Sequence, residues 1–179
     1  MIANHKIHMM WLPLVLLLAA IPLFATTVPK IELPEMVFKA DAIIDGHVDS
    51  IYSEWDAEKK LIFTYISVRI DESLKGGSSR SLLIKQLGGR VGGLDMNVAG
   101  MPLFSEGEQV LLFLRQQTGS TYEVVGLNQG RYQIIQNVAV AHVSGVDLVD
   151  PKTGQIVQAG FVDRVPLADF KAKIRELMK

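Results

Sequence analysis

The chain has 179 residues, a formal net charge of −1, no cysteine and 49% hydrophobic residues. The lack of cysteine excludes a disulfide scaffold, a cysteine-based zinc site and a cysteine nucleophile. Hydrophobic residues make up 19 of the first 25 positions, and without this segment the composition is that of an ordinary globular protein. The distribution predicts an apolar leader on a single domain and argues against a polytopic membrane protein.

Residues 1–25 have the layout of a secretory signal peptide. Lys6 precedes an uncharged run, and small or apolar residues follow it, so we expect cleavage between Ala25 and Thr26. The alternative is an uncleaved transmembrane anchor. The apolar stretch 11–25 contains two prolines and is 15 residues long, whereas a spanning helix needs about 20 apolar residues. We therefore expect an exported protein, periplasmic or secreted, that meets the membrane only through this segment if it is retained.

The rest of the chain is close to electrically neutral. Without Lys6 it has 17 basic and 19 acidic residues. Binding to a nucleic-acid backbone depends on clustered lysine and arginine, so this balance argues against a nucleic-acid partner. We expect no cofactor, and we expect the partner to be a protein or another extracytoplasmic ligand.

Two helices are predicted at the ends of the domain. The segment 34–40 has proline at its first position and Glu35 in its first turn, which favours a short helix with Met36 and Val37 facing inward. The segment 166–179 predicts an amphipathic helix, because apolar residues recur at helical spacing. Those residues are Leu167, Phe170, Ile174 and Leu177.

Between these helices the sequence is typical of many short strands. Alternation over 42–55 and 62–70 predicts a long hairpin around the polar turn 56–60. The run 109–115 is almost entirely apolar, which indicates burial on both faces of a strand. The other strand candidates are 81–87, 94–98, 121–127, 131–136, 138–143, 146–150 and 154–160.

This order of elements predicts a mainly β protein. The expected fold is a small antiparallel OB-like barrel with a short N-terminal helix and an amphipathic C-terminal helix. We expect a signal peptide at 1–25, a spacer at 26–33 and a single domain at 34–179.

The strongest candidate for metal chemistry is the alternating set Asp45, His47 and Asp49. Alternate residues of a strand point to the same side, and carboxylates with imidazole suit several divalent metals. The simpler interpretation is that these residues form the solvent side of an amphipathic strand. Residues two apart on a strand are separated by roughly 6.5–7 Å, so three ligands on one ion would need converging rotamers.

Other catalytic patterns are weak. Apart from the leader, the histidines are His47 and His142, and the latter lies in an apolar run typical of a core or edge strand. A zinc site with three protein ligands would need both histidines and a carboxylate. The G-x-S-x-G motif of a serine nucleophile is absent. We therefore expect a protein without catalytic residues.

The glycine-rich segment 88–93 is a candidate interaction loop. It contains Gly88, Gly89, Arg90, Gly92 and Gly93. The spacing matches neither a P-loop nor a dinucleotide-binding fingerprint. Glycines in this pattern favour sharp bends, bulges and positive φ angles at the corners of small barrels.

The predicted first hairpin also carries four aromatic residues, Tyr52, Trp55, Phe63 and Tyr65. Some of them must lie outside the core if the opposite face of the strand 62–70 points inward. They could form an apolar patch for a partner. The alternative is that the C-terminal helix or further strands cover them.

Several segments between Leu33 and Gln133 resemble a group of uncharacterised exported bacterial proteins. They are ADAIIDGHV, ESLKG, LGGRVGGL, GEQVLLFL and YEVVGLNQGRY. A more distant resemblance is to the netrin-like module, the OB-type barrel of tissue inhibitors of metalloproteinases. It rests on the order of a short helix, the strand entry 40–44, a hairpin, Leu74-Lys75-Gly76 and a later LLFL strand. The resemblance implies a five-stranded barrel with a packed helix. It does not carry over the inhibitory amino-terminal cysteine, because this chain has none.

The sequence leads to three functional hypotheses. The first is an exported, non-enzymatic binding module that uses the loops 56–60 and 88–93 and an open barrel face. The second, based on the netrin-like resemblance, is a modulator or inhibitor of a secreted metalloprotease. The third is a small metal-dependent enzyme that uses Asp45, His47 and Asp49.

Overall fold

The computed structural model describes residues 27–76, 79–157 and 160–179, so the predicted leader and its cleavage site at Ala25 and Thr26 lie outside the described residues. Two α-helices, α2 (Leu33–Lys39) and α3 (Leu167–Leu177), and one 3-10 turn, η1 (Leu127–Gly130), accompany the strands. The strands are β1 (Thr27–Pro29), β2 (Ala42–Trp55), β3 (Ile62–Lys75), β4 (Ser81–Leu87), β5 (Gly89–Val91), β6 (Leu94–Met96), β7 (Gln109–Gln116), β8 (Thr121–Val124), β9 (Arg131–Ile135), β10 (Val138–Val143), β11 (Asp147–Val149), β12 (Ile156–Val157) and β13 (Phe161–Pro166).

The prediction of a mainly β protein with two helices is confirmed. The main sheet has eight strands in the order β13-β10-β9-β7-β2-β3-β4-β8. Two smaller sheets consist of β1-β11-β12 and β5-β6. The long hairpin expected from the alternating sequence is the pair β2–β3, which runs from Trp55 opposite Ile62 to Ile43 opposite Lys75.

The prediction of a small antiparallel barrel needs correction. The main sheet curls, so that β8 pairs with β4 and also with β7, but three further strands extend the sheet beyond β7 and end at the edge strand β13. The sheet as a whole is therefore not a closed barrel. The β4–β8 pairing is parallel and covers only Leu83 with Thr121 and Ile84 with Tyr122. Sequence alternation predicts strands but not their partners, which is why the extension and the parallel pair were missed.

β7 separates two hydrophobic cores and, as predicted, is buried on both faces. Val110, Leu112 and Leu114 point into a core inside the curl, where they meet residues such as Ile66 of β3. Leu111 and Phe113 belong to the other core. All five residues from Val110 to Leu114 are fully buried. The strand is therefore a common wall between the curled part of the sheet and the part beneath the helices.

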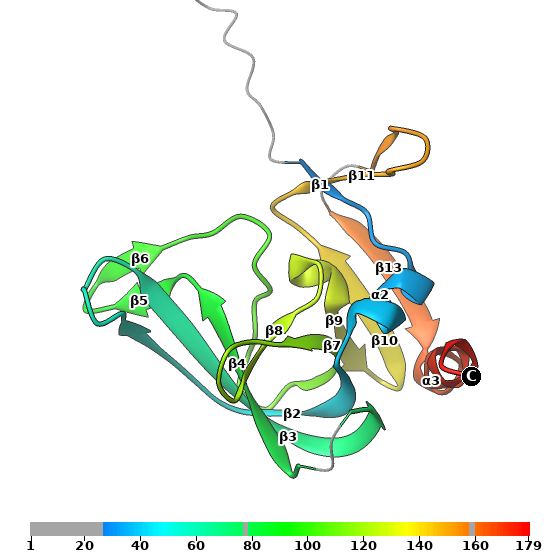
Figure 1. The fold of residues 1–179 in the computed structure, drawn as a ribbon, viewed down its shortest axis with the longest axis horizontal. Helices are drawn as coiled ribbons and strands as arrows, with labels where there is room; N and C mark the ends of the chain where they lie inside the picture. The colour runs from blue at the N-terminus through cyan, green and yellow to red at the C-terminus, as the bar shows by residue number, and fades with distance from the viewer. Residues whose placement is uncertain (1–26, 77–78, 158–159) are drawn as a thin grey trace, which may run out of the picture.

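The two helices pack together over the second core at one end of the molecule (Figure 1). Met36 and Val37 of α2 and Phe170 and Ile174 of α3 are buried there, as the sequence predicted. Phe38, in contrast, is 85% exposed. None of the described helices is long and apolar enough to cross a membrane.

Two local features depart from the expected pattern. A bulge between Val48 and Ser50 leaves Asp49 without a register partner and reverses the alternation, so that Ile51 is on the inner side after it. Part of the predicted spacer 26–33 also joins the fold, because β1 pairs in parallel with β11.

Candidate functional site

The residues proposed as metal ligands are held by different partners. Asp45 is only 3% exposed; its carboxylate accepts a hydrogen bond from Gln109 Nε2 at 2.9 Å and pairs with Lys171 Nζ. His47 Nδ1 lies 2.6 Å from Asp71 Oδ2. Asp49 lies exposed at the bulge of β2. Among residues 27–76, 79–157 and 160–179, no group of three or more histidine, aspartate or glutamate residues could hold a metal ion.

Asp45 belongs instead to an ionic network that fastens α3 to the β2–β3 hairpin. Lys171 Nζ lies 2.8 Å from Glu72 Oε2, and Arg175 also pairs with Glu72. The hydrogen bond from Lys171, followed by the charges of Lys171 and Arg175, lowers the pKa of Glu72 despite its partial burial. Burial alone would lower the pKa of Lys171, but its contacts with Asp45 and Glu72 outweigh this and raise it. The network joins two carboxylates of the hairpin to two basic side chains of α3 and therefore has the character of a structural clamp.

The glycine-rich segment forms the small hairpin β5–β6, with Gly92 and Gly93 at its exposed turn. Gly88 and Gly89 have positive φ angles of 99° and 135°. A Cβ on Gly89 would lie 2.2 Å from Thr64 Oγ1, so only glycine lets the hairpin fold onto β2 and β3. Arg90 pairs with Asp95 at 2.8 Å on the exposed side. The first two glycines therefore position the hairpin, and its tip is free for contact.

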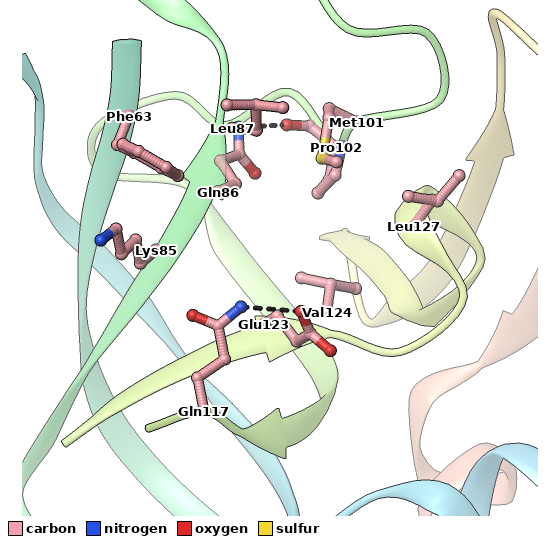
Figure 2. A pocket seen from close by; sticks show the side chains of 10 residues that line it. All are labelled: Phe63, Lys85, Gln86, Leu87, Met101, Pro102, Gln117, Glu123, Val124 and Leu127. Carbon is pink, nitrogen blue, oxygen red and sulfur yellow. Dashed lines mark hydrogen bonds between the residues drawn. The ribbon is translucent and has the colours of Figure 1, made fainter. Parts of the chain in front are cut away.

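A cleft opens where β4 and β8 diverge beyond their short parallel pairing. Figure 2 shows it between Gln86 and Leu87 of β4 on one side and Glu123 and Val124 of β8 on the other. The volume of this hollow is about 270 Å³. Its end is closed by Met101, Pro102 and Leu127. The cleft therefore lies between two strand edges, which splay apart after residue 84 on β4.

A second hollow of about 270 Å³ continues the cleft beneath the β5–β6 hairpin. It shares Gln86, Leu87, Met101 and Pro102 with the first and is also lined by Gly88, Gly89 and Arg90 of the predicted interaction loop. We call the two hollows together the β4–β8 cleft. The predicted loop thus borders one end of a longer binding surface.

Gln86 lies where the two hollows meet. Its Nε2 donates a hydrogen bond to the Pro102 carbonyl oxygen at 3.1 Å (Figure 2). Its Oε1 is buried and has no hydrogen-bond partner among the described residues. Leaving a buried acceptor unpaired costs about 1–3 kcal/mol, so a ligand that donates a hydrogen bond here would recover that free energy.

The outer margin of the cleft is aromatic and cationic. Lys85 Nζ lies 4.2 Å from the ring centre of Phe63 and 5.6 Å from that of Tyr65. Tyr52 stacks on Tyr65 with ring centres 5.0 Å apart and is 49% exposed. The helices lie at the other end of the molecule, so the aromatic patch expected from the sequence is partly open to solvent. At the opposite margin, the Glu123 carboxylate accepts a hydrogen bond from Gln117 Nε2 at 2.7 Å.

Sequence reasoning missed Gln86, although the position of this polar residue in an alternating strand is a signal. Gln86 follows Leu82 and Ile84 on the inward side of β4, and a polar residue at such a position needs a partner. Met101, Pro102 and Glu123 meet it only through pairings between distant parts of the chain.

Comparison with known proteins adds no functional assignment to the cleft. No protein-family model matches the chain, and no curated protein matches it significantly. The functional argument therefore starts from the contacts of the cleft itself.

Proposed function

We propose that this protein is an exported, non-enzymatic binding module that holds an extended segment of a partner protein in the β4–β8 cleft. The observation that carries the proposal is the unpaired Oε1 of Gln86 at the junction of the two hollows. When the Gln86 side chain turns toward the cleft, a backbone N–H of a bound peptide supplies the donor that this oxygen lacks. The apolar walls around it, such as Leu87 and Met101, provide contacts for side chains.

The divergence of β4 from β8 favours a peptide as the ligand. Residues 85–87 of β4 pair with β3 on one side, while the parallel pairing on the other side ends at Ile84 and Tyr122. A strand that pairs on one side only can accept an added strand through main-chain hydrogen bonds, with pockets for alternate side chains. The two hollows along the cleft are suited to such side chains.

The curled part of the sheet supports an OB-like arrangement for this module. The pairings run from β7 through β2, β3 and β4 to β8 and back to β7, with β4 and β8 parallel. This order fits the netrin-like resemblance as a scaffold, with β9, β10 and β13 as an addition. Export is proposed from the leader-like composition of residues 1–25.

The test uses two peptides that differ only in their hydrogen-bond donors. The first is an acetylated and amidated pentapeptide of alternating valine and threonine, and the second is the same peptide with N-methylated backbone amides. We expect the first to bind the protein at least tenfold more tightly, as measured by calorimetry. Its amide-shift perturbations in NMR spectra should centre on Gln86, Leu87 and Val124.

A variant pair tests the role of Gln86. Gln86→Leu removes the unpaired acceptor and should weaken binding of the unmethylated peptide about fivefold or more. Gln155→Leu, an exposed glutamine between β11 and β12, is the matched control and should leave the affinity unchanged. Equal binding of both peptides, equal effects of both variants, or no peptide binding at millimolar concentration would each contradict the proposal.

A further inference from the structure

Another hollow, separate from the β4–β8 cleft, lies on the other side of β7 beneath the helices. Its floor is a row across three neighbouring strands, in which Tyr132 of β9 lies opposite Ala141 of β10 and Ala141 lies opposite Asp163 of β13. The small side chain of Ala141 between two larger ones leaves a space, and Phe170 of α3 and Met36 of α2 border it. The volume of this helix-side hollow is about 300 Å³.

Two polar groups on its wall lack partners. Tyr132 is only 8% exposed, yet its hydroxyl makes no hydrogen bond within the part of the chain that the structure describes. The Asp163 carboxylate likewise has no ion-pair or hydrogen-bond partner among the described residues. Both residues line the hollow, so one bound molecule can contact a hydroxyl and a carboxylate at the same time.

The charge of the hollow favours a cation. Two lysines, Lys30 and Lys173, also border it, but their ammonium groups are engaged with Glu32 at 2.8 Å and Glu176 at 2.9 Å. Among the described charged residues that border the hollow, this leaves the Asp163 carboxylate without an ion-pair partner. Burial and the negative charges of Asp163 and Glu32 raise the pKa of Tyr132 to about 12. The phenol therefore stays neutral and can accept a hydrogen bond from a bound cation.

We propose that the helix-side hollow binds a small primary amine with an apolar body. Its ammonium group pairs with Asp163 and donates a hydrogen bond to the Tyr132 hydroxyl oxygen. The rings of Tyr132 and Phe170, whose centres are 4.6 Å apart, attract the cation through their faces and cover its apolar part. A volume of about 300 Å³ is at the lower end for ligand pockets, which limits the ligand to about one ring and a short chain.

The experiment compares 2-phenylethylamine with 2-phenylethanol, which has nearly the same shape and no charge. Calorimetric titration of the purified full-length chain at neutral pH should give at least tenfold tighter binding of the amine. Shifts of the Ala141 and Val165 methyl signals in NMR spectra should locate the amine in this hollow.

Variants separate a specific ion pair from general attraction. Asp163→Asn should reduce amine affinity to that of the alcohol, whereas Asp169→Asn, an equal charge change in the exposed first turn of α3, should leave it within twofold. Circular dichroism establishes that both variants are folded. Equal affinities for amine and alcohol, equal effects of the two variants, or shifts confined to other residues would overturn the proposal.

Discussion

The two faces of β7 are buried by different kinds of structure. In the curled part, β2, β3, β4 and β8 enclose a core between strands, and its cleft opens between two strand edges. In the helix-covered part, β9, β10 and β13 lie beneath α2 and α3, and the hollow lies on the face of the sheet above Ala141. Within the described residues, the β4–β8 cleft carries an unpaired amide oxygen and the helix-side hollow carries an unpaired carboxylate. A sheet that continues past a curled segment thus obtains two chemically distinct surfaces from one shared strand.

The largest effect on the free energy of unfolding should follow from shortening a buried side chain on either face of β7. Phe113→Ala removes a fully buried ring from the helix-covered core and should lower the free energy of unfolding by about 3–5 kcal/mol. Leu112→Ala, the neighbouring change on the curled side, should cost about 2–5 kcal/mol. Urea unfolding followed by circular dichroism measures both.

The shape of these transitions tests whether the two sides unfold together. Because β7 belongs to both cores, both variants should shift one common transition without splitting it. Two separate transitions in the Phe113→Ala variant would mean that the curled part keeps its structure when the helix-covered part is lost.

The next largest effect concerns the clamp between α3 and the hairpin. Lys171→Met leaves the Asp45 carboxylate, whose side chain is 4% exposed, without its cation. We expect a loss of about 3 kcal/mol, since breaking a buried pair from one side is strongly destabilising. Combining Lys171→Met with Asp45→Asn should recover part of the loss in urea unfolding.

Lys173→Met is the matched control for the clamp. Lys173 and Glu176 form an exposed pair on the same helix, and the expected loss is below about 0.5 kcal/mol. Similar losses for the two lysine variants would mean that the clamp contributes no more than a surface ion pair.

The sequence predicts the helices and strands far better than it predicts which strands pair with each other. The hairpin β2–β3 and helix α3 were predicted because alternation and helical spacing are properties of a local segment. Pairing between β4 and β8 joins segments that are distant in sequence, and period-two patterns carry no information about it. The predicted loop at Gly88 and Gly89 borders the cleft, but Gln86 gains its importance only from the divergence of those strands.

The clamp also predicts an acid dependence of stability. The folded-state pKa of Glu72 lies below its ordinary value of 4.5. A lowered carboxyl pKa gives stability that is present above the unfolded-state value and is lost as the pH falls through the folded-state value. Because the Glu72 side chain is 39% exposed, we expect no more than about 1 kcal/mol.

The free energy of unfolding is measured in urea from pH 6 down to acid. Its decrease with falling pH should be less steep in Glu72→Gln than in the parent protein. Glu176→Gln, which removes a carboxylate from the exposed pair, is the control and should retain the parent slope. An unchanged acid slope in Glu72→Gln would contradict the assigned cause of the pKa shift.

A titration at high pH separates the helix-side hollow from the cleft. Burial, together with the charges of Asp163 and Glu32, raises the pKa of Tyr132 from 10.0 to about 12. The folded state therefore retains a proton that the unfolded state releases, and stability should fall as the pH rises from about 10 to about 12. In phenolate absorbance, Tyr132→Phe should remove the component near pH 12, whereas Tyr52→Phe on the exposed stack should retain it. Asp163→Asn should move that component to lower pH, because it removes one of the charges that oppose the phenolate. If the absorbance component near pH 12 persists in Tyr132→Phe, the tyrosine with the raised pKa is a different one and lies on the other side of β7.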